Sequence, residues 1–146
     1  MGPTKRGKGT KIMAITDRTG LPLAVDIESA SPAEVKLAPG LLCEVRRRIG
    51  GWPERLIADK AYDSDHFRYL LQAAEGELIC PHRRNRKRPS MQDGRKLRRY
   101  KKRWKVERFF AWLFNSRRIV VRYEYHHFNF AGFVHLACAR ILLQHL

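Results

Sequence analysis

Hydrophobic and polar positions alternate with a period of two near the start of the chain. Four apolar residues keep this spacing: Leu21, Leu23, Val25 and Ile27. The segment 10–16, rich in apolar and β-branched residues, precedes them across the turn sequence Asp17-Arg18-Thr19-Gly20. A period of two places alternate side chains on one face of a strand. The sequence therefore predicts a hairpin of two strands joined by this turn.

Helical spacing of apolar residues appears in the segments that follow. The sequence Ser31-Pro32-Ala33-Glu34 has the pattern of a capping box and predicts the start of a helix that ends at Gly50-Gly51. Further helices are expected at about 65–74, 94–115 and 129–144.

A short apolar run at 55–58 ends in Asp59. This pattern is typical of a strand buried in a sheet with a polar residue at its carboxyl end, where ligands tend to bind in α/β proteins. A second short strand is expected at 78–80. Strands that alternate with helices predict a layered α/β fold.

The 146 residues suffice for one compact domain, expected over 1–146. Lys and Arg number 30 against 14 Asp and Glu, a formal net charge of +16, while 44% hydrophobic residues exclude a disordered tail. Such a charge favours a polyanionic partner, above all nucleic acid, although a solvated basic face is the plain alternative. Fourteen of the 30 basic residues lie in a basic loop and helix region at 82–108.

Other residues narrow the choice of function. Three cysteines without C-x-x-C spacing argue against a disulfide framework and a zinc site. The longest apolar stretch contains His135 and Arg140, and no signal peptide is recognised, so we expect a cytoplasmic protein that does not span a membrane. The histidines at 126, 127 and 135 and the aromatic residues of 104–114 are interpreted mainly as surface or core residues, with base stacking as the alternative for the aromatic ones.

Glu107 is an acidic residue inside the basic region. On an α-helix, Arg103 and Tyr100 lie four and seven residues before it on the same face. The spacing alone favours a simple ion pair between Arg103 and Glu107. The alternative is a metal ligand or general base within a phosphate-binding surface, because magnesium takes one or two protein carboxylates and phosphate oxygens.

Two separated motifs decide between these interpretations. Ala58-Asp59-Lys60-Ala61-Tyr62-Asp63, followed downstream by Tyr100-x-x-Arg103-x-x-x-Glu107, resembles the second and third catalytic blocks of bacterial insertion-sequence transposases of the DDE type. Segments 6–12, 17–23, 81–88 and 106–110 resemble the same family, in the same order. The resemblance covers almost the whole chain.

The resemblance implies an RNase H-like α/β fold, with a mixed sheet flanked by helices. It also implies two Asp and one Glu that hold two divalent metal ions, Mg²⁺ or Mn²⁺, for hydrolysis at the element ends and strand transfer into target DNA. Asp59 matches the second Asp and Glu107 matches the Glu. Tyr100 and Arg103 match companion positions that orient the Glu and contact DNA.

The expected partners are the DNA of the element ends and of the target, and either a second copy of the chain or a transposase chain from an upstream reading frame. Eight further basic residues are expected to bind DNA: Lys60, Arg83, Arg84, Arg86, Lys87, Arg88, Lys101 and Lys102.

The sequence departs from the family pattern at two points. The first catalytic Asp lies upstream of the 6–12 block in the family, and no acidic residue precedes Asp17 here. Asp17 falls in the hairpin turn and Asp26 on the following strand, so neither matches. Phe114 stands where the family has Lys. We therefore expect the C-terminal part of a catalytic domain, lacking its first strand and unable to complete the metal site alone; the alternative function is a non-catalytic basic nucleic-acid-binding protein.

Overall fold

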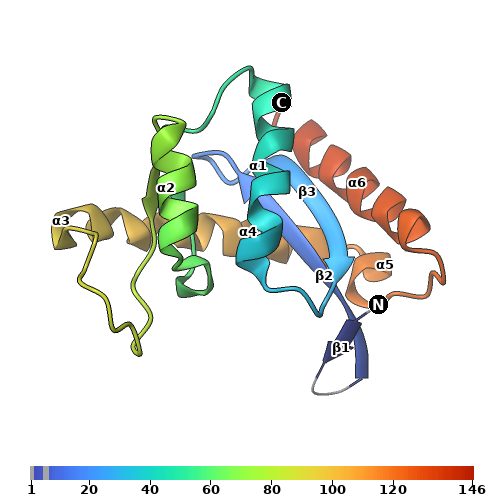
Figure 1. Ribbon diagram of the computed structural model, residues 1–146. Coiled ribbons are helices and arrows are strands. Elements are labelled where there is room, and N and C mark those ends of the chain that lie inside the picture. The colour runs from blue at the N-terminus through green and yellow to red at the C-terminus, as the bar shows by residue number, and fades with distance from the viewer. Residues whose placement is uncertain (1, 5–6) are drawn as a thin grey trace. The chain divides into compact units, whose positions relative to one another are not determined.

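A computed structural model describes residues 2–4 and 7–146 of the protein (Figure 1). The chain divides into two compact units. Unit 1 consists of Met1–Pro32 and Lys105–Leu146, and unit 2 of Ala33–Trp104. The sequence prediction treats 1–146 as one domain, whereas each unit is described by itself below.

An antiparallel sheet forms the first part of unit 1. Its strands are β1 (Gly2–Thr4), β2 (Gly7–Thr16) and β3 (Pro22–Ser29), in the order β1-β2-β3. In the turn between β2 and β3, Oδ1 of Asp17 accepts hydrogen bonds from the backbone N–H groups of Thr19 and Leu21, both at 2.8 Å. Gly20 has a φ of 93°, which favours glycine. The predicted hairpin is confirmed, and Asp17 is a turn residue.

Three helices complete unit 1: α4 (Trp104–Phe114, whose first residue belongs to unit 2), α5 (Arg117–Val120) and α6 (His127–Leu143). The buried core contains Phe109, Leu113, Ile119, Phe130, Val134, Ala137, Cys138 and Ile141. Ile12 and Ala14 of β2 and Val25 and Ile27 of β3 pack against this core, as their period of two predicts. No helix in the described residues is both long and apolar enough to cross a membrane.

Unit 2 is built around a pair of parallel strands. Its elements are α1 (Glu34–Ile49), β4 (Arg55–Ile57), the 3₁₀ helix η1 (Lys60–Tyr62), α2 (Asp65–Ala73), β5 (Glu77–Ile79), α3 (Gly94–Leu97) and the 3₁₀ helix η2 (Arg98–Arg103). Strands β4 and β5 pair in parallel, with Ile57 beside Ile79. Since parallel neighbours need a crossover connection, α2 lies between them in the chain. Both strands and α2 confirm the sequence prediction.

The predicted capping box at the start of α1 does not form. The N-cap residue is Ala33, in an extended conformation, and no side chain caps the helix. Ala30 N–H still donates to Gly9 O at 3.2 Å, and Lys11 Nζ donates to Pro32 O at 2.9 Å. These two hydrogen bonds hold residues 30–32 outside the helix. The helix therefore begins at Glu34, two residues after Pro32, and Ser31 is not its N-cap.

The long helix predicted at 94–115 is divided into α3, η2 and α4. Five of the six residues of η2 are cationic. A 3₁₀ helix rises about 2.0 Å per residue against about 1.5 Å in an α-helix, which separates like charges along the axis. Residues i and i+3 eclipse in this geometry, so Tyr100 and Arg103 lie on one side of η2.

The described strands therefore belong to two sheets, one antiparallel and one parallel, with helices in both units. The protein has a mixed α/β fold, as the sequence predicts at the level of class.

Candidate functional site

Asp59 lies at the carboxyl end of β4, as the sequence predicts. Ala58 N–H donates to Ile79 O of β5 at 3.0 Å, which extends the strand pairing up to this point. Asp59 is then the N-cap of η1, and its Oδ1 accepts a hydrogen bond from Lys60 N–H at 2.7 Å. The side chain is half-buried.

Tyr100 of η2 reaches the same carboxylate. Its hydroxyl donates to Oδ1 of Asp59 at 3.2 Å. Burial raises the pKa of Tyr100 and the nearby Asp59 charge raises it further, against the opposing effect of Arg103, so the hydroxyl keeps its proton and acts as a donor. The Arg103 guanidinium lies 5.6 Å from the centre of the Tyr100 ring. The structure thus brings together Asp59, Tyr100 and Arg103, three of the predicted site residues.

The backbone around Asp59 is held by two side chains from the segment after β5. Cys80 Sγ donates to Asp59 O at 3.0 Å. The Arg83 guanidinium donates to Lys60 O at 3.1 Å and to Ala61 O at 2.6 Å. Burial raises the pKa of the Cys80 thiol to about 12, which keeps it protonated as a donor. Arg83, predicted to bind DNA, therefore has a positioning role here, and its contact with DNA stays a prediction.

Asp63 anchors the other end of η1 and is a residue to which sequence analysis gave no role. Its Oδ1 lies 3.1 Å from Arg68 Nη2 and 2.9 Å from His82 Nδ1, and its Oδ2 accepts a hydrogen bond from Arg83 N–H at 2.8 Å. Its side chain is only 3% exposed. Since Met91 N–H donates to His82 Nε2, we assign the His82 proton to Nδ1, where it donates to Asp63.

A signal for this network is present in the sequence. Arg68 lies in α2 directly after Phe67 and three residues before Leu71, two buried apolar residues. An arginine on a buried helix face needs acceptors. Arg68 finds them in Asp63, in Cys80 O at 2.7 Å and in Leu78 O at 3.2 Å.

The basic residues of the 82–108 region are used in different ways. Arg86 and Arg88 donate to the two oxygens of Asp65, at 2.7 and 2.9 Å, and these bonds hold the pKa of Asp65 below its usual value. The Arg86 side chain is 12% exposed, whereas that of Arg88 is 76% exposed. The remaining predicted DNA-binding residues are exposed: Lys60, Arg84, Lys87, Lys101 and Lys102.

Glu107 lies exposed in the first turn of α4, in unit 1. It does not share an α-helix with Tyr100 and Arg103, which belong to η2. Joint binding of a metal by Asp59 and Glu107 stays a prediction. Among the described residues, no group of three or more His, Cys, Asp or Glu side chains is arranged to hold a metal ion.

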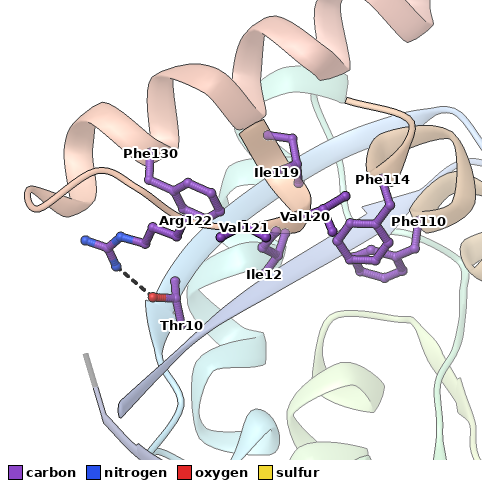
Figure 2. A pocket seen from close by; sticks show the side chains of 9 residues that line it. All are labelled: Thr10, Ile12, Phe110, Phe114, Ile119, Val120, Val121, Arg122 and Phe130. Atoms are coloured by element: carbon purple, nitrogen blue, oxygen red, sulfur yellow. Dashed lines mark hydrogen bonds between the residues drawn. The ribbon is translucent and has the colours of Figure 1, made fainter. Parts of the chain in front are cut away.

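Unit 1 also has a cavity of about 530 Å³ (Figure 2). Its lining is mostly apolar: Thr10, Ile12, Phe110, Phe114, Ile119, Val120, Val121, Arg122 and Phe130. Arg122 donates to Thr10 Oγ1 at 2.6 Å, to Glu124 O at 2.9 Å and to Tyr125 O at 3.0 Å, so each guanidinium nitrogen has an acceptor. Phe114, which replaces the expected Lys, stacks on Phe110 with ring centres 6.0 Å apart. At this position the chain has an apolar surface in place of a cation.

Comparisons with known proteins agree with the motifs. Residues 2–142 match the family model described as Transposase DDE domain. The chain is 36% identical over 139 residues to a Brucella ovis protein named as a transposase for insertion sequence element IS6501, covering 92% of this chain and 98% of that protein. It is 32% identical over 146 residues to a Burkholderia cepacia protein named as a transposase for insertion sequence element IS402, covering 95% of this chain and 65% of that protein. No solved structure matches the chain.

Proposed function

The chain belongs to the transposase DDE domain family of insertion sequences, and we propose that it acts in DNA transposition through Asp59 and Glu107 as metal-binding carboxylates. Family membership supports a DNA transposase, with DNA as its partner and a general dependence on divalent metal ions. Cleavage of the element ends and strand transfer into target DNA are the steps proposed for this chain.

The observation that carries the proposal is the hydrogen bond from the Tyr100 hydroxyl to Oδ1 of Asp59. It joins the two motif blocks through residues that lie 41 positions apart in the chain. An ion pair between Arg103 and Glu107 would not require this contact. A function in which the Asp59 carboxylate needs a fixed orientation does require it, because metal ligands are commonly oriented by a second hydrogen-bonded group.

The Asp59 carboxylate suits an oxygen-binding cation. Within the described part of the chain, its two hydrogen bonds both go to Oδ1, which leaves Oδ2 for another ligand. Mg²⁺ takes one or two protein carboxylates and completes its shell with water and phosphate oxygens. We propose Mg²⁺ or Mn²⁺, held by Asp59 and Glu107 in a two-metal arrangement. When bound, such ions activate the attacking oxygen and stabilise the leaving one.

The other residues of the site orient Asp59 or bind DNA. Tyr100 bonds the Asp59 carboxylate. Cys80 bonds the Asp59 carbonyl, and Arg83 bonds the carbonyls of the next two residues. The exposed cations Lys60, Lys101 and Lys102 would contact DNA phosphates. An RNase H-like arrangement stays our proposal for the fold, supported by the parallel pair β4 and β5 with Asp59 at its carboxyl end.

We propose that residues 1–146 supply two of the three carboxylates of the family. Asp17 is bonded to Thr19 and Leu21 within its turn, and the exposed Asp26 accepts a hydrogen bond from Ile27 N–H at 2.8 Å. Both carboxylates are used in local hydrogen bonds. This supports the observation from the sequence that neither matches the first catalytic Asp of the family. The third carboxylate would then come from outside residues 1–146.

Metal binding tests the site without requiring activity. Mn²⁺ is titrated into the protein and the unbound ion is followed by electron paramagnetic resonance. We expect Asp59→Asn and Glu107→Gln each to weaken Mn²⁺ binding at least about tenfold, and Tyr100→Phe to weaken it by about tenfold because the carboxylate is no longer oriented. Asp26→Asn removes an exposed carboxylate elsewhere and should change binding less than twofold. Unchanged binding in both Asp59→Asn and Glu107→Gln would contradict the proposed site.

Strand cleavage tests the reaction. The substrate is a plasmid that carries this coding sequence with its flanking DNA, incubated with Mg²⁺ or Mn²⁺. Cleavage that survives Asp59→Ala and Glu107→Ala would rule out the proposed residues. Robust cleavage by the chain alone that depends on both would instead show that the third carboxylate is present. DNA binding with neither metal binding nor cleavage would favour the non-catalytic nucleic-acid-binding function.

A further inference from the structure

The segment between α5 and the first turn of α6 carries an unusual number of rings. Five of the six residues at 123–128 are aromatic or histidine: Tyr123, Tyr125, His126, His127 and Phe128. Tyr123 is 73% exposed, Tyr125 87% and Phe128 60%, and both histidines are exposed as well. Large rings grouped on a surface, where they gain nothing from burial, indicate a binding partner. We call these five residues the aromatic segment.

Four of these rings are in contact with one another. The rings of His126 and Phe128 are stacked, with centres 5.1 Å apart and planes 21° apart. The edge of one ring meets the face of the other between Tyr125 and His126, at 5.1 Å, and between His127 and Phe128, at 6.0 Å. Offset and edge-to-face contacts at these distances are favourable. The aromatic segment therefore presents a small stack of rings that a further flat ring can extend.

Two arginines hold the backbone of this segment in place. Arg122 donates to Glu124 O at 2.9 Å, to Tyr125 O at 3.0 Å and to Thr10 Oγ1 of β2 at 2.6 Å, the last of which is drawn in Figure 2. Arg118 donates to Oε1 of Glu124 at 3.2 Å. The exposed rings thus project from an ordered backbone. A site that is ordered before its ligand arrives loses less conformational entropy on binding.

The charges around the aromatic segment indicate the chemistry of the partner. Residues 115–146 include four arginines and one acidic residue, Glu124. The Glu124 side chain is 8% exposed and is paired with Arg118, whereas Arg117 and Arg118 are themselves exposed. The surface therefore offers rings and cations, while its one carboxylate is buried. This combination complements a chain of flat bases joined by phosphates.

We propose that the aromatic segment is a stacking site for unpaired nucleotides of single-stranded DNA. Bases stack on Tyr125 and Phe128, and the guanidinium groups of Arg117 and Arg118 bind the adjoining phosphates. In a duplex both faces of a base are covered by its neighbours, so this site selects nucleotides that have left the duplex. Every base has an aromatic face, and stacking therefore gives little preference for sequence.

The stacking site is separate from the proposed metal site, because it contains neither Asp59 nor Glu107. It is also separate from the cations of η2 that are proposed to bind DNA phosphates. Those cations bind any DNA through its backbone, whereas the aromatic segment requires exposed bases. The inference can therefore be tested without a divalent metal ion, and its failure would leave the proposed function unchanged.

Two labelled oligomers separate base contacts from phosphate contacts. One is an oligothymidylate of about 12 nucleotides, and the other is an oligomer of the same length made of abasic sites, which has the same phosphates and no bases. Fluorescence anisotropy measures the binding of each to the whole chain in EDTA at one salt concentration. We expect the parent chain to bind the oligothymidylate at least about tenfold more tightly than the abasic oligomer. Equal affinity for the two would overturn the proposal.

Substitutions then locate the stacked bases. Tyr125→Ala and Phe128→Ala should each weaken binding of the oligothymidylate at least about fivefold and change binding of the abasic oligomer less than about twofold. Tyr125→Trp keeps a ring and should retain the tight binding.

The matched control is Tyr69→Ala, which removes a tyrosine that is 58% exposed on α2 and should leave both affinities unchanged. Circular dichroism checks that each variant is folded, which we expect for Tyr125→Ala because its side chain is almost fully exposed. A preference for the oligothymidylate that persists in both Tyr125→Ala and Phe128→Ala would place the bases elsewhere and overturn the proposal. Equal losses of affinity for the two oligomers would do the same.

Discussion

The Asp63 carboxylate is surrounded by partners on both of its oxygens. Arg68, whose side chain is 8% exposed, relies on it together with two backbone carbonyls. Removing one member of a buried ion pair leaves the other charge without compensation, which costs more than the pair contributes. At the residue scale, Asp63 therefore holds in place the segment that follows Asp59.

Asp63→Asn is expected to lower the free energy of unfolding by about 3 kcal/mol, because Arg68 then stays buried without its counter-charge. Urea denaturation followed by circular dichroism measures the change. Asp93→Asn, which affects an exposed pair with Arg95, is the matched control and should change stability much less than Asp63→Asn. Equal effects of the two substitutions would contradict the role of Asp63.

The same carboxyl predicts a pH dependence. Burial alone raises the pKa of Asp63, but hydrogen bonds from Arg83 N–H, His82 and Arg68 outweigh it and hold the pKa below its ordinary value of 3.8. Its contribution to stability is therefore present above pH 3.8 and is lost as the pH falls through the lowered pKa. Urea midpoints measured from pH 6 downward should fall less steeply for Asp63→Asn than for the parent chain. If the urea midpoints of Asp63→Asn and of the parent chain fell equally with pH, the Asp63 carboxyl would not be the source of this pH dependence.

The cysteines should differ in reactivity. Cys43 is exposed, whereas Cys80 is buried and its pKa is raised to about 12. Since the thiolate is the reactive form, iodoacetamide at pH 8 should label Cys43 at least about a hundredfold faster than Cys80. Mass spectrometry of tryptic peptides follows both sites in one experiment. Rapid labelling of Cys80 in the folded protein would show that its environment is more open than described.

At the scale of elements, α1 begins without a side-chain cap. Ala33 has the extended conformation of an N-cap residue but cannot accept a hydrogen bond. Ala33→Ser should therefore raise the free energy of unfolding by about 1 kcal/mol. Ser31→Ala should leave the free energy of unfolding nearly unchanged. If the capping box predicted from the sequence had formed, Ser31→Ala would lower it. Thermal denaturation of the two variants distinguishes the two starting points of the helix.

Local patterns predicted several elements correctly. The β2–β3 hairpin and the strand–helix–strand segment from β4 to β5 were predictable because each has periodic apolar residues and turn signals within a few positions. The 3₁₀ helix η2 was not predictable, because apolar spacing resembles an α-helix on either side of it. Tyr100 and Arg103 were correctly placed on one face, but in a 3₁₀ and not an α-helical geometry.

At the scale of the whole molecule, the net charge of +16 favours DNA binding, and the number of phosphates that the cations neutralise sets how this binding responds to salt. Removing a cation that binds one phosphate should make the slope of log K against log salt concentration less negative by about 0.9. We expect this change for Lys101→Ala and for Lys102→Ala, measured by fluorescence anisotropy on a 40-base-pair duplex. Arg47→Ala, an exposed residue paired with Glu44, is the control and should leave the slope unchanged. A slope unaffected by Lys101→Ala and Lys102→Ala would remove η2 from the DNA interface.

The sequence by itself determined the family, the α/β class and the candidates Asp59, Tyr100, Arg103 and Glu107, because motifs and periodic patterns are local. Only the tertiary structure placed the Tyr100 hydroxyl on the Asp59 carboxylate and Asp63 among Arg68, His82 and Arg83. It also distinguished the basic residues from one another: Arg86 is bonded to Asp65, whereas Lys101 and Lys102 are exposed. The physical reason is that a charge in a sequence has no defined partner, and burial and hydrogen bonding, which arise only on folding, decide which charges are used within the chain.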